Sequence, residues 1–269
     1  MVPLDEESGL IEWVPNTVTF RKVLLTIYKE KHMEVKGRDI QASWTKVKGK
    51  ETGPWFKEML EKHPPVFHEW LLDTFPEPSA WFSSRLAYTR TTAAISMVGY
   101  IVGLGDRHGE NILIDETTGG TVHVDFNCLF EKGKTFEFKE LVPFRLTHNM
   151  TDAFGVTGKE GVFRQSCEVS LRVMRQNQDT LLSVLETFIH DPLVEWSRSK
   201  AVNTKFSQAP VKAPADAESA VKQVRGKLQG TERGNSGALS VEGQVADLLK
   251  EATNPENLKK MFVGWAAYL

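Results

Sequence analysis

The stretch from Met97 to Phe130 constrains the fold of this chain more strongly than any other part of the sequence. An apolar run ends in Gly-Leu-Gly at residues 103–105, and a polar loop, a short apolar segment and a turn follow it. A second strand-like segment runs from Thr121 to Phe126 and carries one acidic residue. The periodicity therefore predicts a buried helix, a polar loop and a β-hairpin, in that order.

The polar residues of this stretch are those that metal-assisted phosphoryl transfer needs. The loop carries Asp106, His108 and Asn111, and the predicted hairpin returns Asp125 to the same space. Mg²⁺ accepts a carboxylate and an amide oxygen while it keeps phosphate oxygens and water as its other ligands. Asp125 and Asn111 are therefore predicted to hold the metal. Asp106 is predicted to accept the proton of the substrate hydroxyl, and His108 to donate to the phosphoryl oxygens.

Taken singly, each of these residues also has a structural interpretation. A lone Asp in a loop is commonly a turn residue or a helix cap, Asn111 could cap the turn that follows it, and His108 could serve a local hydrogen bond. Four such residues at this spacing, with a hairpin between them, favour one functional site over four independent structural roles.

The composition is that of an ordinary globular protein. Of 269 residues, 41% are hydrophobic and 25% are charged, and the net charge of −2 indicates no general affinity for nucleic acid or a membrane surface. Cys128 and Cys167 show no metal-ligand spacing, and two cysteines suit a reducing compartment rather than a disulfide framework. No secretory signal opens the chain, and its longest apolar run, near residues 93–104, is too short to cross a bilayer.

The rest of the sequence predicts mostly helix. Apolar residues at helical spacing, with Pro, Ser or Thr at the starts, place helices at residues 17–31, 55–61, 66–75, 78–102, 147–154, 161–175, 178–191 and 217–228 and in the tail from 240 onward. Thr17 and Ser240 are predicted as N-caps. Val98 and Val184 are among the residues predicted to face the core.

The order of the site residues resembles a known family. Asp106 and Asn111 have the spacing of the Asp and Asn in a protein-kinase catalytic loop, but the His follows the Asp in GDRHGEN instead of preceding it. This inverted order resembles the phosphatidylinositol 3-kinase-related protein kinases. The stretches VHVDFNCLFEKGKTFE, VPFRLTHNM and HDPLVEWS resemble the ATR-like checkpoint branch of that family. Asn127 replaces the usual kinase Gly, as in that branch, which argues against a Gly-dependent flip of this segment.

The resemblance implies a mostly helical α+β fold, namely a protein-kinase-like C-terminal lobe with a small β-hairpin catalytic region and a helical C-terminal tail. The N-terminal lobe is expected to be largely absent, because the chain contains no Gly-rich loop and no Val-Ala-Ile-Lys-like strand. The implied domains are the end of the N-lobe and the hinge at 1–16, the C-lobe at 17–196, a basic regulatory linker at 197–237 and a FATC domain at 238–269. Within the C-lobe, the implied functional segments are the catalytic loop at 103–111, the metal-binding segment at 121–127 and the activation segment at 125–148.

The same resemblance implies a nucleotide site. ATP with Mg²⁺, or alternatively Mn²⁺, is the expected cofactor. Glu12, Trp13 and Val14 resemble the hinge, where the backbone pairs with the adenine edge and the indole packs against the ring. Without the family, Trp13 would be interpreted as a core aromatic residue. Leu113 and Val124 are expected to form the floor of the adenine pocket, which is compatible with a place in the core of the hairpin.

The implied function is that of a nuclear serine/threonine protein kinase in DNA-damage checkpoint signalling. Its expected partners are protein substrates with Ser or Thr before Gln, an ATR-interacting subunit in the full-length kinase, and DNA only indirectly through partners, with no membrane. The tail aromatics are expected to pack on the kinase lobe, although a partner or membrane contact is an alternative; they are Phe262, Trp265 and Tyr268. This chain alone is expected to bind ATP weakly and to transfer phosphate negligibly.

Two other functions fit part of the sequence. A lipid kinase shares the inverted loop, but it needs a basic activation segment, and residues 131–140 carry three Glu against three Lys. A non-catalytic scaffold of the same fold would be expected to lose Asp106, Asn111 or Asp125, and all three are present. The missing N-lobe keeps the scaffold interpretation open for this chain.

Overall fold

A computed structural model describes residues 2–5, 8–33, 36–48, 50–189, 213–232 and 237–269. Residues 197–212 and 233–236 of the predicted linker, together with the predicted helix end at Asp191, lie outside these residues. Within the described residues, no helix combines the length and the apolar character that crossing a membrane requires.

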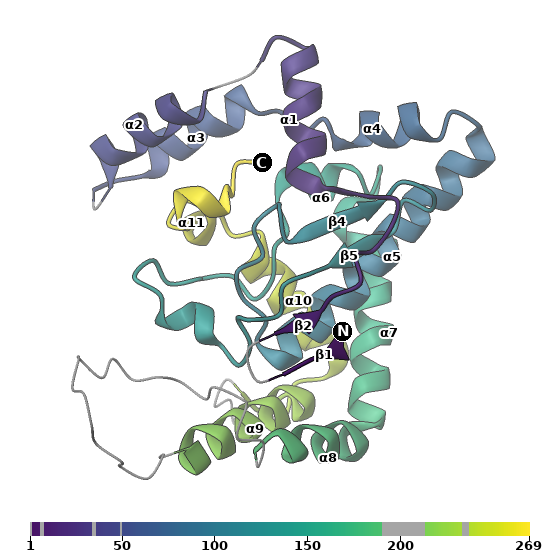
Figure 1. Ribbon diagram of the computed structural model, residues 1–269, viewed down its shortest axis with the longest axis vertical. Helices are drawn as coiled ribbons and strands as arrows, with labels where there is room; N and C mark the ends of the chain where they lie inside the picture. Colours follow the sequence, from purple (N-terminus) through teal and green to yellow (C-terminus); the bar gives the residue numbers. More distant parts are fainter. Residues whose placement is uncertain (1, 6–7, 34–35, 49, 190–212, 233–236) are drawn as a thin grey trace.

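The helix α5 (Pro78–Val102) is the spine of the molecule, and its predicted bounds are confirmed. It lies side by side with α7 (Val162–Gln176), as Figure 1 shows. Tyr88 and Met97 face the core from α5, whereas Val98 is exposed, so its predicted core position is wrong. The helix ends at Gly103, whose φ of 62° is readily adopted by glycine and turns the chain into the polar loop.

A small antiparallel sheet covers one side of α5. It contains β3 (Thr17–Thr19), β4 (Ile112–Asp115) and β5 (Thr121–His123), in that order, so the predicted hairpin is confirmed. The predicted N-cap at Thr17 is wrong, because residues 17–19 pair with β4 as a strand. Thr19 instead caps α1 (Phe20–Glu30) by accepting a hydrogen bond from the amide of Lys22 at 3.2 Å.

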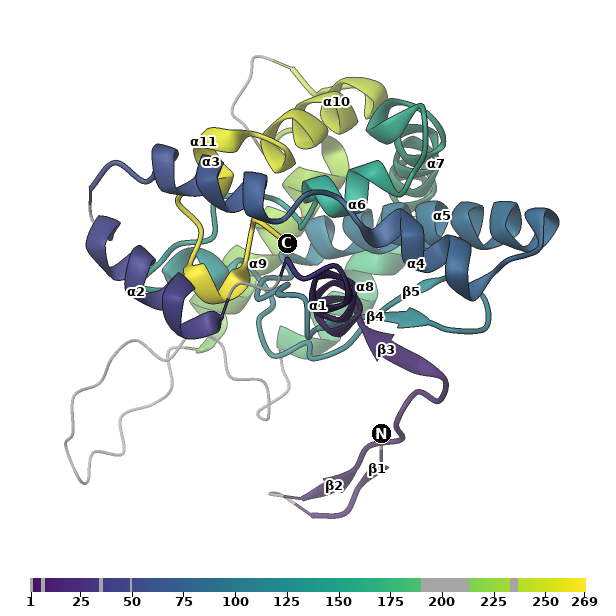
Figure 2. The ribbon, with the colours of Figure 1, turned by 90° about the horizontal axis from the view of Figure 1, so that it is seen from above.

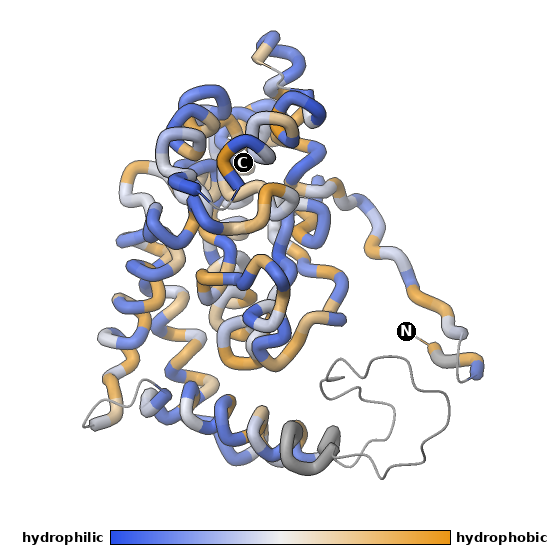
Figure 3. Tube along the Cα trace, turned by 90° about the vertical axis from the view of Figure 1, so that its left-hand side faces the viewer, coloured by the Kyte–Doolittle hydropathy of each residue, from blue (hydrophilic) through white to orange (hydrophobic). Residues whose placement is uncertain are grey.

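The N-terminal residues form a separate hairpin of β1 (Val2–Pro3) and β2 (Gly9–Leu10). Figure 2 shows this hairpin extending away from the body of the molecule, and Figure 3 shows apolar residues along the extended segment. The Trp13 side chain is 71% exposed, so the interpretation of Trp13 as a core aromatic is wrong for this structure.

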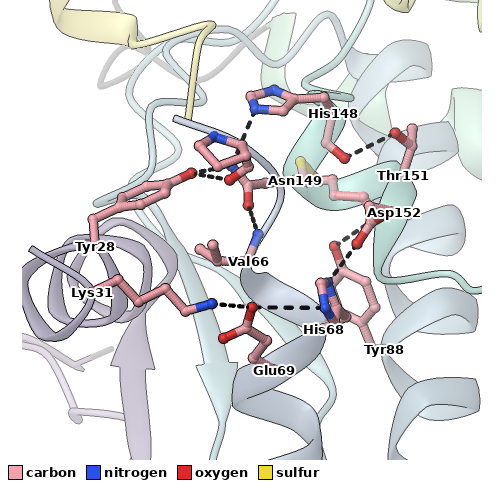
Figure 4. A network of polar contacts seen from close by, with 12 residues as sticks. Tyr28, Lys31, Val66, His68, Glu69, Tyr88, His148, Asn149, Thr151 and Asp152 are labelled. Atoms are coloured by element: carbon pink, nitrogen blue, oxygen red, sulfur yellow. Dashed lines mark hydrogen bonds and ion pairs between the residues drawn. The ribbon is translucent and has the colours of Figure 1, made fainter. Parts of the chain in front are cut away.

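A buried polar network joins three helical segments next to the sheet (Figure 4). The Asn149 side chain, on α6 (His148–Asp152), accepts from the amide of Val66 at 2.8 Å and donates to the hydroxyl of Tyr28 at 2.9 Å. The Tyr28 hydroxyl on α1 donates to the carbonyl of Pro64 at 2.7 Å, just before α4 (Phe67–Thr74). Burial raises the pKa of Tyr28 to about 12, so the hydroxyl stays a donor.

Two further helices, α2 (Gly37–Val47) and α3 (Gly53–Lys62), lie beside the tail (Figure 1). At the other end of the molecule, α8 (Gln178–Ile189) packs on α9 (Ala213–Gln229). Leu182 faces the core from α8, but Val184 is exposed and its predicted core position is wrong. The helix α10 (Val241–Ala252) begins at Ser240, which accepts from the amide of Gly243 at 3.0 Å, so this predicted N-cap is confirmed.

Helix α9 reaches the base of the activation segment through one lysine. Lys227 is only 1% exposed, and its ammonium group donates to the carbonyl of Tyr100 at 2.7 Å and to the carboxylate of Glu131. Glu131 itself lies at a φ of 63°, and its amide donates to the carbonyl of Gly103 at 3.0 Å. A helix from beyond the lobe thus helps to fix the start of the activation segment.

The tail, with α11 (Pro255–Leu258), folds back against the activation segment. Arg145 is buried, and its guanidinium donates to the carbonyls of Trp265, Ala266 and Leu269 at 2.5, 2.8 and 3.1 Å. It also lies 4.4 Å from the centre of the Trp265 ring. Burial lowers the pKa of Arg145 to about 9. Trp265 and Tyr268 are buried, which confirms packing on the lobe, whereas Phe262 is 47% exposed.

The Arg145→Met variant is expected to loosen the tail. Three buried carbonyls would lose their donors, and each such loss costs about 1–3 kcal/mol. Even one such loss of about 2 kcal/mol corresponds to roughly a 30-fold larger population of the detached tail, so the expected increase is at least of this size. Limited trypsin digestion followed by mass spectrometry should show faster cleavage after Lys260 and earlier release of residues 261–269.

The matched control is Arg164→Met, because Arg164 is a surface residue that pairs with Glu160 at 2.9 Å and with Glu168 at 3.0 Å. This control should leave the release of residues 261–269 unchanged. Release at the wild-type rate in Arg145→Met would show that the guanidinium does not hold the tail.

Candidate active site

The polar loop and the end of β5 are held together by backbone hydrogen bonds. The amide of Gly105 donates to the carbonyl of Cys128 at 2.7 Å, and the amide of Val124 donates to the carbonyl of Asn111 at 3.1 Å. These bonds bring residues 103–111 and 121–128 side by side. The second strand ends at His123 rather than at Phe126, because Asp125 leaves the extended conformation.

Arg107 organises the space between the two segments. Its side chain is inside the protein, 3% exposed, and donates to the carbonyls of Gly105 at 2.8 Å, Val124 at 2.7 Å and Asp125. Burial lowers the pKa of Arg107, while the carboxylates of Asp106, Asp125 and Glu140 counteract this effect. The guanidinium therefore lies among three carboxylates whose negative charge stabilises it. The sequence placed Arg107 within the motif but gave it no role.

Both candidate acids lie on strained backbone. Asp106 has a φ of 59° and Asp125 a φ of 60°, in the left-handed region that aspartate tolerates better than most residues. Such conformations cost about 1–3 kcal/mol and persist where the surroundings impose them. The backbone amide of Asp106 donates a hydrogen bond to the Glu140 carboxylate at 2.9 Å. Glu140, on the activation segment, was not predicted as a site residue.

Asn111 and His108 lie beside Asp106, as predicted. The Asn111 amide nitrogen donates to the carbonyl of Asp106 at 2.9 Å, which leaves the amide oxygen for another ligand. The ring of His108 comes within 3.9 Å of the Asp106 carboxylate. The backbone amide of Asn111 donates to the backbone carbonyl of His108 at 3.0 Å. The structure thus brings three of the four predicted residues into mutual contact, and Arg107 links the fourth, Asp125.

The donor set of this site fits a hard divalent cation. The side chain of Asp125 is exposed and offers a carboxylate, and Asn111 offers an amide oxygen. In the described part of the chain, no group of three or more His, Cys, Asp or Glu side chains converges as a metal site. Two protein ligands at this position suit an ion that takes its other ligands from phosphate oxygens and water.

Two apolar residues of the hairpin region, Leu113 and Val124, are predicted to form the floor of the adenine pocket. Leu113, in the middle of β4, is 2% exposed and lies opposite Val122 and Thr19 in the sheet. Val124 is half-buried and follows β5 directly. Val124 precedes Asp125 directly, whereas Leu113 is enclosed in the sheet, so the apolar floor for a flat aromatic ring stays a prediction.

The predicted hinge residues are not brought to the site. Glu12, Trp13 and Val14 are all exposed, on the segment that extends away from the body. Among the described residues, no hydrogen bond, ion pair or ring contact joins them to the two site loops. They lie in the segment between β2 and β3, and the β1–β2 hairpin before them pairs only with itself in the described sheet topology.

The tail forms one wall of a pocket beside Asp106. This pocket has a volume of about 170 Å³ and is lined by Asp106, His108, Phe136, Phe138, Glu140, Met261, Phe262, Gly264 and Trp265. The rings of Phe138 and Phe262 lie 5.3 Å apart across it. Activation segment and tail thus meet directly next to the candidate base, an arrangement that the sequence did not predict because it depends on long-range packing.

Comparison with known proteins agrees with this geometry. Residues 1–198 match the family model for phosphatidylinositol 3- and 4-kinase, and residues 238–269 match the model for the FATC domain. Protein kinase rad3 of Schizosaccharomyces pombe is 51% identical over 270 residues, covering 100% of this chain and 11% of the relative. Serine/threonine-protein kinase ATR of Arabidopsis thaliana is 49% identical over 98% of this chain and 10% of its own length.

A solved structure described as the FAT and kinase domain of CtTel1 superposes with a TM-score of 0.84 at 38% identity. The superposition covers 97% of this chain and 18% of the CtTel1 chain. The chain thus spans about a tenth of the length of the curated relatives that it matches. On these matches and this fold, the chain belongs to the phosphatidylinositol 3- and 4-kinase family and carries a FATC domain at its C-terminal end.

Proposed function

We propose that this chain is the catalytic C-terminal lobe of an ATP-dependent serine/threonine protein kinase of the ATR type, active in DNA-damage checkpoint signalling. The observation that carries the proposal is the buried guanidinium of Arg107, which binds both site loops and so sets Asp106 and Asp125 around one space. The names of the similar proteins, protein kinase rad3 and serine/threonine-protein kinase ATR, support the same activity.

In this mechanism each residue has a separate task. Asp125 and the Asn111 amide oxygen hold Mg²⁺, or alternatively Mn²⁺, which when bound neutralises charge on the ATP phosphates. Asp106 accepts the proton of the substrate hydroxyl as that oxygen attacks the γ-phosphate. His108, next to Asp106, donates to the phosphoryl oxygens. Leu113 and Val124 support the adenine ring from below, and Glu12, Trp13 and Val14 contact it once the hinge is held by an N-terminal lobe.

The substrate is proposed to be a protein with Ser or Thr before Gln. The pocket beside Asp106 supports this choice, because it can take one side chain next to the reacting hydroxyl. Its walls are aromatic and it contains the polar group of Glu140, a combination that suits an uncharged amide side chain.

A lipid substrate is less well supported. The head-group phosphates of a lipid need free basic side chains on the activation segment. Here Lys134 pairs with Glu131 at 2.8 Å, and Lys132 donates to the carbonyl of Asn127 at 3.5 Å. These two lysines are already engaged within the segment.

The domain division at 1–16, 17–196, 197–237 and 238–269 is part of the proposal, and the two family matches, which end at residue 198 and begin at residue 238, support the two boundaries of the linker. We further propose that the kinase acts in the nucleus with an ATR-interacting subunit and reaches DNA through partners. The whole protein is the system in which to test these assignments, because the chain spans about a tenth of its relatives.

The paired variants Asp125→Asn and Asp106→Asn in the full-length kinase are expected to separate binding from transfer. Loss of the Asp125 carboxylate should weaken magnesium-dependent ATP binding by roughly 10- to 100-fold, because it removes a charged metal ligand. Loss of the Asp106 carboxylate should leave ATP binding intact and lower kcat by about 10²- to 10⁴-fold, because it removes the proton acceptor.

Fluorescent ATP binding with and without Mg²⁺, together with phosphate transfer to a Ser-Gln peptide and to phosphatidylinositol vesicles, checks both expectations. A wild-type kinase that phosphorylates only the vesicles would replace the protein-kinase proposal by the lipid-kinase one. ATP binding that is unchanged both by removal of Mg²⁺ and by the Asp125→Asn substitution would favour a non-catalytic scaffold.

The Arg107→Lys variant of the full-length kinase is expected to lose activity although the positive charge is kept. A lysine ammonium cannot reach three carbonyls that a planar guanidinium spans, so the two loops would shift against each other. A displacement of this kind costs about 10²-fold in kcat. Arg172→Lys is the matched control, since Arg172 is a surface residue that pairs with Glu242 at 2.7 Å. Full activity of Arg107→Lys would show that charge alone suffices at this position.

A further inference from the structure

Glu140 lies where the activation segment contacts the backbone of the candidate base. Its carboxylate accepts the amide hydrogen of Asp106, with 2.9 Å between the nitrogen and the oxygen. Asp106 is also the residue whose φ of 59° requires an external constraint. An amide that donates to a carboxylate makes one of the stronger protein hydrogen bonds, so this contact is able to supply the constraint.

Two glycines make room for this carboxylate. A Cβ atom on Gly105 would lie 2.4 Å from the second oxygen of Glu140, and a Cβ atom on Gly133 would lie 2.0 Å from the same oxygen. Neither distance is possible between real atoms, so any larger residue at either position displaces Glu140. The glycines come from different segments, the catalytic loop and the activation segment, and the Glu140 side chain fills the gap between them.

The surroundings keep the carboxylate in place. The backbone amide of Glu140 donates to the carbonyl of Gly133 at 3.1 Å, which fixes the side chain at its base. The pKa of Glu140 is raised, chiefly by burial and also by the nearby negative charge of Asp106, while Arg107 opposes the shift. Glu140 also lines the pocket beside Asp106 and a larger pocket of about 610 Å³ behind the catalytic loop, so it forms the wall between them.

We propose that Glu140 is a positioning residue that holds the backbone of Asp106 in the conformation needed for proton acceptance. It acts through the Asp106 amide, and it couples the folded state of the activation segment to the orientation of the base. When the segment moves, the carboxylate leaves the glycine cradle formed by Gly105 and Gly133, and Asp106 loses its constraint. This inference rests on the proposed function of Asp106.

The test uses the full-length kinase and separates kcat from the KM for ATP. Glu140→Ala should lower kcat by about 10- to 100-fold, the range expected for a misplaced catalytic group, with little change in the KM for ATP. Glu140→Gln keeps an acceptor oxygen of the same reach and should restore most of kcat. A purely structural role would lower the amount of folded enzyme instead, which magnesium-dependent ATP binding reports.

The glycine cradle offers an independent variant. Gly133→Ala leaves Glu140 chemically intact but puts a methyl group where its carboxylate lies, so it should reproduce the kcat of Glu140→Ala. In the double variant Gly133→Ala, Glu140→Ala, the added methyl group no longer meets a carboxylate. Its kcat should therefore equal that of Glu140→Ala rather than fall further. Glu137→Ala is the matched control, because Glu137 is an exposed glutamate that pairs with Lys48 at 3.5 Å.

The outcomes distinguish this inference from the proposed function. If Asp106→Asn retains normal kcat, the assignment of the base fails and the role of Glu140 fails with it. If Asp106→Asn is inactive while Glu140→Ala keeps wild-type kcat, the base stands and the positioning role of Glu140 is wrong. If the kcat of the Gly133→Ala, Glu140→Ala double variant falls by the product of the two single losses, the proposed role of the glycine cradle is also wrong.

Discussion

The buried guanidinium of Arg107 is the interaction on which the arrangement of the site depends. Residues 103–111 follow the long helix α5 and Asp125 follows the hairpin of β4 and β5, so neither element alone fixes how Asp106 and Asp125 lie relative to each other. Arg107 bonds to carbonyls of both segments and lies among the carboxylates of Asp106, Asp125 and Glu140. An isolated buried cation is costly, and here backbone carbonyls and nearby acids offset that cost together.

The activation segment connects this centre to the rest of the molecule. At its start, Glu131 bonds to Gly103 of the catalytic loop and to Lys227 of α9. At its end, Arg145 binds the tail, and between them Glu140 meets Asp106. Two elements that follow the lobe in sequence, α9 and the tail, therefore contact the same segment that borders Asp106, and a change in either element reaches the site through few contacts.

The sequence predicted most of what depends on local pattern. The bounds of α5, the hairpin, the Ser240 cap and the meeting of Asp106, His108 and Asn111 were predictable because short-range periodicity and motif spacing encode them. Thr17 was misassigned because its strand exists only through pairing with β4. Glu140 and the aromatic pocket were missed for the same reason, since their partners lie 34 or more residues away in the chain. The hinge assignment stays a prediction, because Glu12, Trp13 and Val14 are exposed and lie away from the site loops.

The hydrogen bonds between the Arg145 guanidinium and the tail also affect the order in which the protein folds during its synthesis. Its guanidinium bonds to carbonyls that follow it by 120 to 124 residues in the chain. Until those residues leave the ribosome, the cation has no tail to bind and its pocket stays open to water. The lobe therefore cannot complete its core by folding from the N-terminus as synthesis proceeds. Closure of the pocket beside Asp106 therefore becomes a late step, because Met261, Phe262 and Trp265 of the tail line it.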